Sequence, residues 1–327
     1  MSIQLSIHQE EWSPIRPFRI AGMEWNSFPM IVVELQDGHL VGRGEAMGIF
    51  YFNETLASMI AQVEEVTERI VAGATRTDLL DLLPPGGARS ALDCALWDLE
   101  SKRSGKRVWE IAGIELKKIV TVTTIGMEDE PETMAKHAAA LANYPVLKIK
   151  LDADRPVERI EAIRSVRPDA TIAIDVNQGW NFDQLKEFAP RMKALGVSMI
   201  EQPLPRGEDE ELESYESPIL LCGDESCIHG GELEVASNRY QMINIKLDKS
   251  GGLTHAIEIA RQAKKQDLGL MLGTMGGTSL GMAPSFVVGL LCDFHDLDGP
   301  LLLTNDRSFG IKYKDGVVEP PLRNLWG

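Results

Sequence analysis

The chain of 327 residues has little of what marks secreted, membrane-spanning or nucleic-acid-binding proteins. Its four cysteines form no CxxC pair and have no zinc-ligand spacing, which is typical of free thiols in a reducing cytoplasm. Lysine and arginine total 33 against 49 aspartates and glutamates, so the formal net charge is −16. Such an acidic surface repels phosphate backbones and anionic lipids, and we expect neither nucleic acid nor membrane as a partner.

Long apolar runs are also missing. The most apolar late stretch, residues 286–292, is far shorter than the ~20 residues that a membrane span needs. The first residues show no basic region followed by an apolar run, so no signal peptide is predicted. We therefore expect a cytoplasmic protein with a small-molecule partner, and the composition is compatible with a homo-oligomer.

The length suggests more than one core, because single hydrophobic cores stop growing at roughly 250–300 residues. The first part of the chain is typical of a mixed α+β domain. Two β-rich runs, 30–35 and 40–46, flank an Asp-Gly turn, and an amphipathic helix follows with Asn53 as its predicted N-cap. A second helix is predicted over 88–99, with Gly105 as its stop.

Short apolar runs, 20 to 27 residues apart and separated by helix-like segments, fill the chain from about residue 117. They cover 119–125, 146–151, 171–175, 197–201, 219–223, 242–246, 268–273 and 292–297. Eight strands alternating with helices predict a parallel α/β barrel. A Rossmann sheet is the competing fold, but no GxGxxG follows a first strand. We predict a capping domain at 1–115, a barrel at 116–305, and a segment at 306–327 that packs back on the capping domain.

Two lysines end the second predicted strand, at the face where (β/α) barrels carry active sites. Lys148 and Lys150 are two residues apart, so they point to the same side of the strand. Adjacent ammonium groups disfavour each other's charge, which would lower the pKa of one lysine and prepare it as a base. The alternative is a pair of surface lysines on an edge strand.

Carboxylates close the next three strands, at Asp175, Glu201 and Asp224. Three converging carboxylates without histidine or cysteine are hard oxygen ligands suited to Mg²⁺. Asn177 and Glu225 stand beside them and are predicted to support the ligands. An N-cap of the following helix is the simpler explanation for any single carboxylate, but three at consecutive strand ends favour a metal site.

Lys246 ends the sixth strand, four strands away from Lys150. In an eight-stranded barrel this is the opposite wall. Two lysines that face one another across a metal site could remove a proton from one face of a carbon and return it to the other face, which would invert a stereocentre.

Five segments resemble motifs of the enolase superfamily, muconate-lactonising subgroup, and within it the dipeptide epimerases. They are Lys148-Ile149-Lys150, Asp175-Val176-Asn177, Glu201-Gln202-Pro203, Gly223-Asp224-Glu225-Ser226 and 244–252 (NIKLDKSGG). The resemblance covers essentially the whole chain, including the helix at 88–99. It implies a modified TIM barrel, (β/α)7β, with an N-terminal α+β capping domain.

The resemblance also implies a role for each motif residue. Mg²⁺ would be bound by Asp175, Glu201 and Asp224. Lys150 and Lys246 would be the two acid/base catalysts, with Lys148 assisting and stabilising the substrate carboxylate. The implied reaction epimerises a dipeptide at the α-carbon of its C-terminal residue, through an enediolate. The use of lysine or histidine bases with Mg²⁺ is the general pattern of the superfamily. The residue spacing in this chain does not by itself establish it.

Asp296-Leu297-Asp298, after the eighth strand, resembles the Asp-x-Asp with which dipeptide epimerases hold the free α-ammonium of the substrate. Its alternative is an ordinary Asp-Gly-Pro turn. Thr274 and Met275 lie in a glycine-rich segment after the seventh strand, where glycines would let the substrate backbone approach closely. A phosphate cradle is less favoured there, because no GK[ST] follows.

Specificity is expected from two capping-domain loops. The first, 21–28, lacks the arginine with which relatives acting on Ala-Glu hold the glutamate side chain, and the second, 48–52, is aromatic. We therefore expect substrate contacts from Glu24 and Tyr51, and a C-terminal side chain that is apolar, or cationic and paired with Glu24. Arg19 is another source of the missing charge, and the aromatic residues could instead only pack the cap on the barrel.

Alternative functions remain open from the sequence. N-acyl amino acid racemisation, o-succinylbenzoate synthesis and muconate cycloisomerisation use the same lysines and metal. Asp296 and Asp298 favour a dipeptide, because those other substrates offer no amine for two carboxylates to bind. A non-catalytic barrel is disfavoured, because such a protein gains nothing from buried charge.

Overall fold

Three antiparallel strands open the chain in the computed structural model, which describes residues 3–327. Strand β4 (Phe28–Asp37) lies between β1 (Gln4–Trp12) and β5 (Leu40–Ala46). The β4–β5 hairpin confirms the two β-rich runs and the turn predicted between them. Strand β1 was not predicted, since its residues are mostly polar and none of them is fully buried.

Helices α1 and α3 cover this sheet. The short helix α2 follows α1, and the short helix α4 follows α3. Their bounds are α1 (Leu56–Val71), α2 (Leu79–Leu82), α3 (Gly87–Ser104) and α4 (Val108–Ile111). The predicted N-cap of α1 was wrong. Thr55 caps the helix by accepting a hydrogen bond from the Ser58 backbone, whereas Asn53 ends the 3-10 turn η1 (Phe50–Phe52) in a left-handed conformation. Gly105 ends α3 as predicted.

Helix α3 lies directly on β5, and two glycines make this close approach possible. A Cβ on Gly44 would lie 2.0 Å from the carbonyl oxygen of Ala91, and one on Gly42 would lie 2.3 Å from that of Ala95. The other side of α3 contacts the barrel, where Trp97 Nε1 donates to Thr254 Oγ1 at 3.0 Å. Because α3 is sandwiched in this way, nearly all of its residues are buried.

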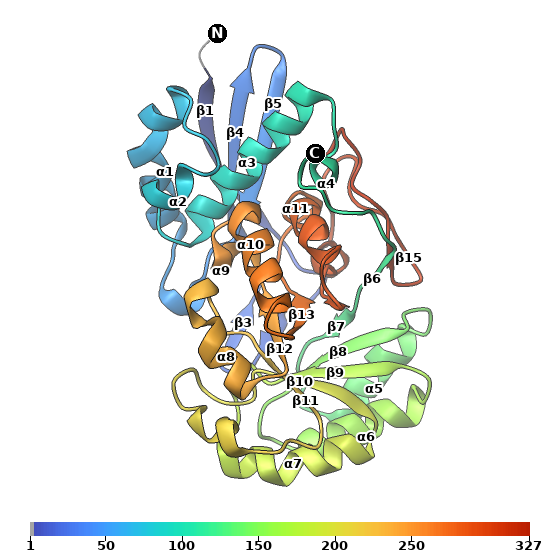
Figure 1. Ribbon diagram of the computed structural model, residues 1–327. Helices are drawn as coiled ribbons and strands as arrows, with labels where there is room; N and C mark the ends of the chain where they lie inside the picture. The colour runs from blue at the N-terminus through green and yellow to red at the C-terminus, as the bar shows by residue number, and fades with distance from the viewer. Residues whose placement is uncertain (1–2) are drawn as a thin grey trace.

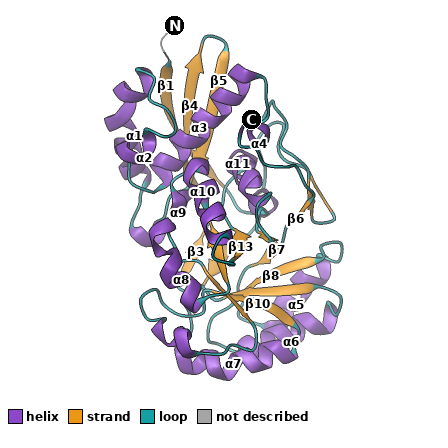
Figure 2. Ribbon diagram, viewed as in Figure 1, coloured by secondary structure: helices purple, strands orange, loops and turns teal. Residues whose placement is uncertain are grey.

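Eight parallel strands form a curled sheet with helices on its outer side (Figures 1 and 2). In spatial order they run β7 (Thr123–Ile125), β8 (Val146–Lys150), β9 (Thr171–Asp175), β10 (Val197–Glu201), β11 (Leu220–Gly223), β12 (Met242–Ile245), β13 (Gly269–Leu272) and β14 (Phe294–His295). Each falls within one of the eight predicted apolar runs, so the predicted parallel sheet is confirmed.

Helices follow six of these strands. They are α5 (Pro131–Ala140), α6 (Pro156–Val166), α7 (Phe182–Ala194), α8 (Leu233–Arg239), the pair α9 (Leu247–Ser250) and α10 (Leu253–Lys264), and α11 (Ser279–Gly289). Strand β10 is followed only by the 3-10 turn η2 (Glu210–Ser214). The inward-facing residues of the sheet include a small sulfur-rich cluster with Met199, Cys222 and Met271.

Isolated hydrogen bonds join the residues just before β7 to the end of β14 and the residues that follow it, at the two edges of this sheet. The Val122 backbone nitrogen donates to the His295 carbonyl at 2.9 Å, and the Leu297 nitrogen donates to Thr121 Oγ1 at 2.8 Å. The adjacent strand β6 (Ile119–Val120) pairs instead with β16 (Val317–Val318), which also pairs with β15 (Tyr313–Lys314). The barrel therefore closes through a seam, with Asp296 within it and Asp298 directly after it.

The last residues of the described chain lie against the first domain. Trp326 is buried, and its Nε1 donates to the Arg43 carbonyl at 3.0 Å, while the Gly327 nitrogen donates to Asp98 at 2.7 Å. These contacts support the proposed return of segment 306–327 to the capping domain. The domain limits at 115 and 305 stay a prediction.

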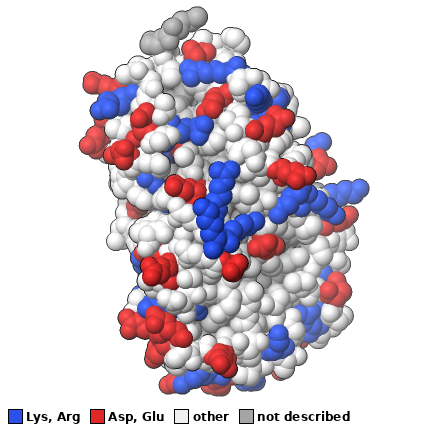
Figure 3. Space-filling view, in the orientation of Figure 1, with Lys and Arg blue, Asp and Glu red and all other residues white. Residues whose placement is uncertain are grey.

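Charges of both signs are spread over the face shown in Figure 3, and basic side chains gather near its middle. The net charge of −16 therefore does not make this face uniformly acidic. Within residues 3–327, the helices are all too short or too polar to cross a bilayer.

Candidate active site

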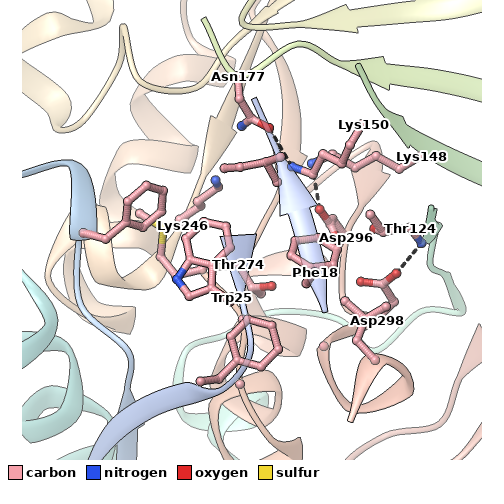
Figure 4. A pocket seen from close by; sticks show the side chains of 18 of the residues that line it. Phe18, Trp25, Thr124, Lys148, Lys150, Asn177, Lys246, Thr274, Asp296 and Asp298 are labelled. Carbon is pink, nitrogen blue, oxygen red and sulfur yellow. Dashed lines mark hydrogen bonds and ion pairs between the residues drawn. The ribbon is translucent and has the colours of Figure 1, made fainter. Parts of the chain in front are cut away.

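A pocket with about 700 Å³ of space, part of it open to solvent, lies where the barrel strands end beneath the loops of the capping domain (Figure 4). Both domains contribute to its lining. The barrel supplies Thr124, Lys148, Lys150, Asn177, Glu225, Lys246, Thr274, Met275, Gly276, Gly277, Asp296, Asp298, Gly299 and Leu302, and the cap supplies Phe18, Ile20, Trp25, Phe28, Phe50 and Tyr51.

Lys148 and Lys150 are both buried at the end of β8, as expected for two residues on one face of a strand. The ammonium of Lys148 lies 2.8 Å from Glu201, 2.8 Å from Asp296 and 3.0 Å from Asp175. The ammonium of Lys150 lies 2.6 Å from Asp175 and 3.1 Å from Asn177 Oδ1. The two lysines are therefore part of a buried ionic network, and the alternative of surface lysines was wrong.

The expected lowering of a lysine pKa by its neighbour was wrong for Lys148. Burial disfavours its charge, but Asp296, Glu201 and Asp175 outweigh burial and raise the pKa of Lys148 well above its ordinary value. Three close carboxylates stabilise an ammonium more than one adjacent lysine destabilises it.

Lys246 lies on the other side of the pocket from Lys148 and Lys150 (Figure 4). It follows β12 and its ammonium lies 2.6 Å from Asp224. Against the opposing effect of burial, Asp224, Glu201 and Glu225 raise the pKa of Lys246. Lys150 and Lys246 thus approach the pocket from two walls, each beside a different strand-end carboxylate.

The three predicted metal ligands are fully buried at the ends of β9, β10 and just after β11. Burial raises the pKa of Glu201 to about 7, and the charges of Asp175 and Asp224 add to the increase. Burial also acts on Asp224, but Lys246 and Lys249 lower the pKa of this carboxyl to about 2. Glu201 therefore lies within electrostatic reach of both other carboxylates.

Ammonium groups lie among these carboxylates, and residues 3–327 contain no cluster of three or more acidic, histidine or cysteine side chains arranged tightly enough to hold a metal ion. The donor chemistry nevertheless fits a divalent cation. Glu201 Oε2 and Asp224 Oδ2 are buried oxygens that accept no well-aligned hydrogen bond, although they lie 2.8 Å and 2.6 Å from the ammonium nitrogens of Lys148 and Lys246. Buried carboxylate oxygens that repel one another are suited to Mg²⁺.

Asn177 contacts both neighbours expected of a supporting residue. Its Oδ1 accepts from Lys150, and its backbone nitrogen donates to Asp175 Oδ1 at 3.0 Å. Glu225 lines the pocket, but its Oε2 has no hydrogen-bond partner among residues 3–327. Burial raises the pKa of Glu225 to about 8, and Asp224 contributes to the increase.

Two supporting residues were missed as individuals, although both lie in segment 244–252. Asn244 Nδ2 donates to Glu201 at 2.7 Å, and Lys249 Nζ lies 2.5 Å from Asp224. The signal was available, because Asn244 precedes Lys246 by two residues on the same face of β12. Lys249 was harder to find, since α9 carries it back toward β11.

Asp296 and Asp298 both line the pocket beside the seam. Asp296 pairs with Lys148, and Asp298 accepts a hydrogen bond from the Thr124 backbone nitrogen at 2.5 Å. Burial and the charge of Asp296 raise the pKa of Asp298 to about 8. The pair therefore offers one ionised carboxylate and one that readily holds a proton.

Thr274 and Met275 line the pocket, as predicted. Their loop is fixed by Glu45 of β5, which accepts from the Thr278 backbone nitrogen at 2.7 Å. Gly276 and Gly277 have φ values of 120° and 139°, which favour glycine.

Tyr51 also lines the pocket, and its buried hydroxyl has no hydrogen-bond partner in the described part of the chain. Burial raises the pKa of Tyr51, and Asp224, Glu225 and Asp248 contribute to the increase. The loop around it is held at Gly48, whose backbone nitrogen donates to Asp248 at 2.9 Å.

Glu24 does not line the pocket, in contrast to the prediction. It lies in the hairpin of β2 (Phe18–Ile20) and β3 (Met23–Trp25), in which Phe18 faces Trp25 and Arg19 faces Glu24. Side chains alternate along a strand, so Phe18 and Trp25 face the pocket while Arg19 and Glu24 form an exposed pair at 3.7 Å. The sequence predicted that this loop contacts the substrate, but not which of its alternating side chains face the pocket.

Models of two protein domains match the chain. The model described as "Mandelate racemase / muconate lactonizing enzyme, N-terminal domain" matches residues 2–113, and "Enolase C-terminal domain-like" matches residues 133–323. Together they cover most of the sequence.

Two curated relatives are similar over nearly their whole length. The chain is 39% identical to an N-acetyl-D-glutamate racemase from Pseudoalteromonas sp., over 91% of this chain and 95% of that protein. It is 38% identical to the L-Ala-D/L-Glu epimerase of Escherichia coli K12, over 96% of this chain and 98% of that protein.

Two solved structures share the fold. An enolase family member from Agrobacterium tumefaciens with homology to dipeptide epimerases, with bound sodium and L-Ala-L-Glu, has a TM-score of 0.97 and 40% identity, covering 99% of this chain and 100% of that one. A dipeptide epimerase from Methylococcus capsulatus, complexed with Mg and L-Arg-D-Lys, has a TM-score of 0.90 and 28% identity, covering 98% and 97%.

Proposed function

Because the chain belongs to the mandelate racemase/muconate lactonizing enzyme family of the enolase superfamily, we propose that it is an isomerase that epimerises a dipeptide at the α-carbon of its C-terminal residue. One observation carries the proposal. Lys150 and Lys246 reach the same pocket from two walls, and each lies beside a different buried carboxylate. This arrangement is what a proton transfer between the two faces of a carbon requires.

The two lysines alternate in their roles. The neutral lysine on one wall takes the α-proton, and the ammonium on the other wall gives a proton to the opposite face of the resulting enediolate. The lysines exchange protonation states, so the reverse reaction uses the same groups. Lys148, which stays protonated among three carboxylates, contributes positive charge where the substrate carboxylate becomes a dianion.

We propose that Mg²⁺ is held by Asp175, Glu201 and Asp224. When bound, it supplies positive charge that stabilises the substrate carboxylate as it gains a second negative charge. The buried, mutually repelling carboxylates support this assignment, as does the Mg in the related dipeptide epimerase from Methylococcus capsulatus. Asn177, Asn244 and Lys249 hold the ligands in place through the contacts described above.

Asp296 and Asp298 are proposed to receive the free ammonium of the dipeptide. They lie beyond Lys148, at the end of the pocket nearest the seam. A substrate ammonium would stabilise the ionised form of Asp298, whose proton is otherwise held by burial and by Asp296.

An N-acyl amino acid racemase is the second candidate, and a specific observation favours it. Both carboxylates of the proposed ammonium site already have partners, Lys148 for Asp296 and Thr124 for Asp298, and a protonated Asp298 could donate a hydrogen bond to an acyl oxygen. One of the two similar curated relatives is an N-acetyl-D-glutamate racemase.

Deuterium exchange distinguishes the two candidates. The protein is incubated in D₂O with Mg²⁺ and with paired substrates, L-Ala-L-Xaa and N-acetyl-L-Xaa, and label at the α-carbon is followed by mass spectrometry. A dipeptide epimerase labels the C-terminal residue of the dipeptides. Exchange confined to N-acetyl amino acids would favour the racemase, and no exchange in either series would contradict both.

The metal assignment is tested separately with Asp224→Asn. We expect weaker Mg²⁺ binding by calorimetry together with loss of exchange. Full activity in the presence of a chelator would contradict a role for the metal.

A further inference from the structure

The capping domain covers the pocket with a group of aromatic rings. Phe18, Trp25 and Phe28 lie at mutual centroid distances of 6.2 to 6.5 Å, and Phe50 meets Trp25 edge-to-face at 4.9 Å. All four line the pocket, together with Ile20. We name this group the aromatic roof, and contacts of this kind make a stable apolar surface.

The positively charged groups of the pocket lie away from this roof. The cations that line it are Lys148, Lys150 and Lys246, which stand at the strand ends and are each paired with carboxylates. Arg19 is the arginine nearest to Trp25 in the sequence, but it does not line the pocket. It pairs with Asp129 at 3.0 Å. Within residues 3–327, a carboxylate placed under the aromatic roof would therefore meet no cation of the pocket lining that is not already paired.

A cationic side chain of the substrate would likewise find no carboxylate of the described residues beside the aromatic roof. The carboxylates that line the pocket are Glu225, Asp296 and Asp298, which stand on the barrel side. Glu24, the acidic residue of the hairpin, lies on its outer face and pairs with Arg19. A charge buried without a partner is costly. The faces of aromatic rings attract a cation, but this attraction is weaker than the cost of burying an unpaired ammonium or guanidinium, so the aromatic roof disfavours charge of either sign.

The direction of each substituent follows from the proposed function, on which this inference rests. The α-hydrogen must face one of the two lysines, and the carboxylate must lie toward the buried acidic residues and Lys148. The amide nitrogen leads toward Asp296 and Asp298. The fourth substituent, the side chain, is left with the remaining direction, toward the capping domain and its rings.

We infer that Trp25 is a specificity-determining residue and that the epimerised residue carries an apolar side chain, aliphatic or aromatic. Trp25 is the central ring of the aromatic roof, because it contacts Phe18, Phe28 and Phe50. The hairpin register places it on the pocket face, opposite Phe18. This departs from the glutamate named for the two curated relatives.

The test uses two substrate series, which differ from each other only in the group on the nitrogen of the epimerised residue. The side chain is varied through Leu, Phe, Glu and Lys in L-Ala-L-Xaa and in N-acetyl-L-Xaa, and kcat/KM is measured for α-deuterium exchange with Mg²⁺. We expect kcat/KM for Leu or Phe to exceed that for Glu and Lys by at least roughly 100-fold, because the charged side chains would be buried without a partner. A preference for Glu or for Lys overturns the inference.

The two series separate this inference from the proposed function. Exchange in N-acetyl-L-Leu without exchange in L-Ala-L-Leu would overturn the dipeptide proposal and uphold the apolar site. Exchange in L-Ala-L-Glu with none in L-Ala-L-Leu would uphold the dipeptide proposal and overturn the apolar site.

Trp25→Arg tests the residue itself. An arginine in the aromatic roof should raise the Glu-to-Leu ratio of kcat/KM by at least about 10-fold. The matched control is Asn26→Arg, which adds the same charge at the next residue, where the side chain is exposed and outside the pocket lining. An equal change in both variants, or none in Trp25→Arg, overturns the role of Trp25. If Trp25→Arg does not fold, Trp25→Leu should lower kcat/KM for Phe more than for Leu, and equal lowering overturns it.

Discussion

Lys148, Lys150 and Lys246 have the same functional group but different surroundings. All three line the pocket, but Lys148 is enclosed by three carboxylates, whereas Lys150 and Lys246 each pair with one strand-end carboxylate. Three paired carboxylates hold a proton more firmly than one does, so Lys150 and Lys246 are better suited than Lys148 to exchange a proton with a substrate. At the scale of single residues, this difference separates the proposed electrostatic role of Lys148 from the proposed acid/base roles of the other two.

Replacing one base should uncouple exchange from inversion. In Lys150→Ala we expect epimerisation to fall by about 10³-fold, within the usual contribution of a general acid or base, while Lys246 still exchanges the α-hydrogen of one epimer. Mass spectrometry of each epimer in D₂O measures both rates. Lys136→Ala, on the exposed side of α5, is the control. Undiminished epimerisation in Lys150→Ala would refute the two-base assignment.

The strand ends could be predicted from the sequence because apolar runs and the polar residues that follow them are local signals. Lys148, Asp175, Glu201 and Lys246 were identified in this way. The structure places Lys148 and Lys246 in the lining of one pocket, and Asp175 and Glu201 in contact with Lys148 behind it. The hairpin was predicted less well. Glu24 was assigned to the substrate, but the pairing of Arg19 with Glu24 sets which face meets the pocket, and that register is not visible in so short a segment. Lys249 was missed because its contact depends on how α9 turns.

At the scale of elements, β5 and α3 depend on the absence of a side chain between them. A Cβ on Gly44 would lie 2.0 Å from Ala91 O and 2.8 Å from Ala95 N, both of which are backbone atoms of α3. Backbone cannot move aside as a flexible side chain can, so the helix would have to shift as a whole. The same β5 carries Glu45, which fixes the loop of Thr274 and Met275.

Gly44→Ala should therefore destabilise the protein by at least about 2–3 kcal/mol, near the upper range for overpacking. Urea unfolding followed by circular dichroism measures the change. Gly126→Ala is the matched control, since its Cβ would lie 3.4 Å or more from its neighbours and should change stability by less than about 1 kcal/mol. Similar stability of the two variants would contradict the packing argument.

At the scale of the whole molecule, buried carboxyl groups connect the cap and the barrel. Asp93 of α3 accepts hydrogen bonds from the Thr254 backbone nitrogen at 2.9 Å and hydroxyl at 2.5 Å. Burial raises the pKa of Asp93 to about 6, although the bonds from Thr254 act in the opposite direction. Burial likewise raises the pKa of Asp248, which holds Gly48, to about 6.

This interface should lose stability as the pH rises from about 4 to 6. The folded state keeps the proton of Asp93 over a range in which the unfolded state, with an ordinary carboxyl pKa, has released it, so the free energy of unfolding falls with pH there. Two pKa units correspond to roughly 3 kcal/mol. Asp93→Asn cannot titrate, so the difference in unfolding free energy between variant and wild type should change across this range. Parallel pH curves would show that Asp93 does not titrate there.

The β2–β3 hairpin forms a two-stranded sheet of its own within residues 3–327, apart from the barrel sheet that carries the lysines. A mutation in this ribbon can alter which molecules enter without disturbing the groups that move protons. Homologues could therefore diverge in substrate specificity through this hairpin while they keep the same reaction. The short ribbon is accordingly the natural place to begin when the enzyme is to be redesigned for another peptide.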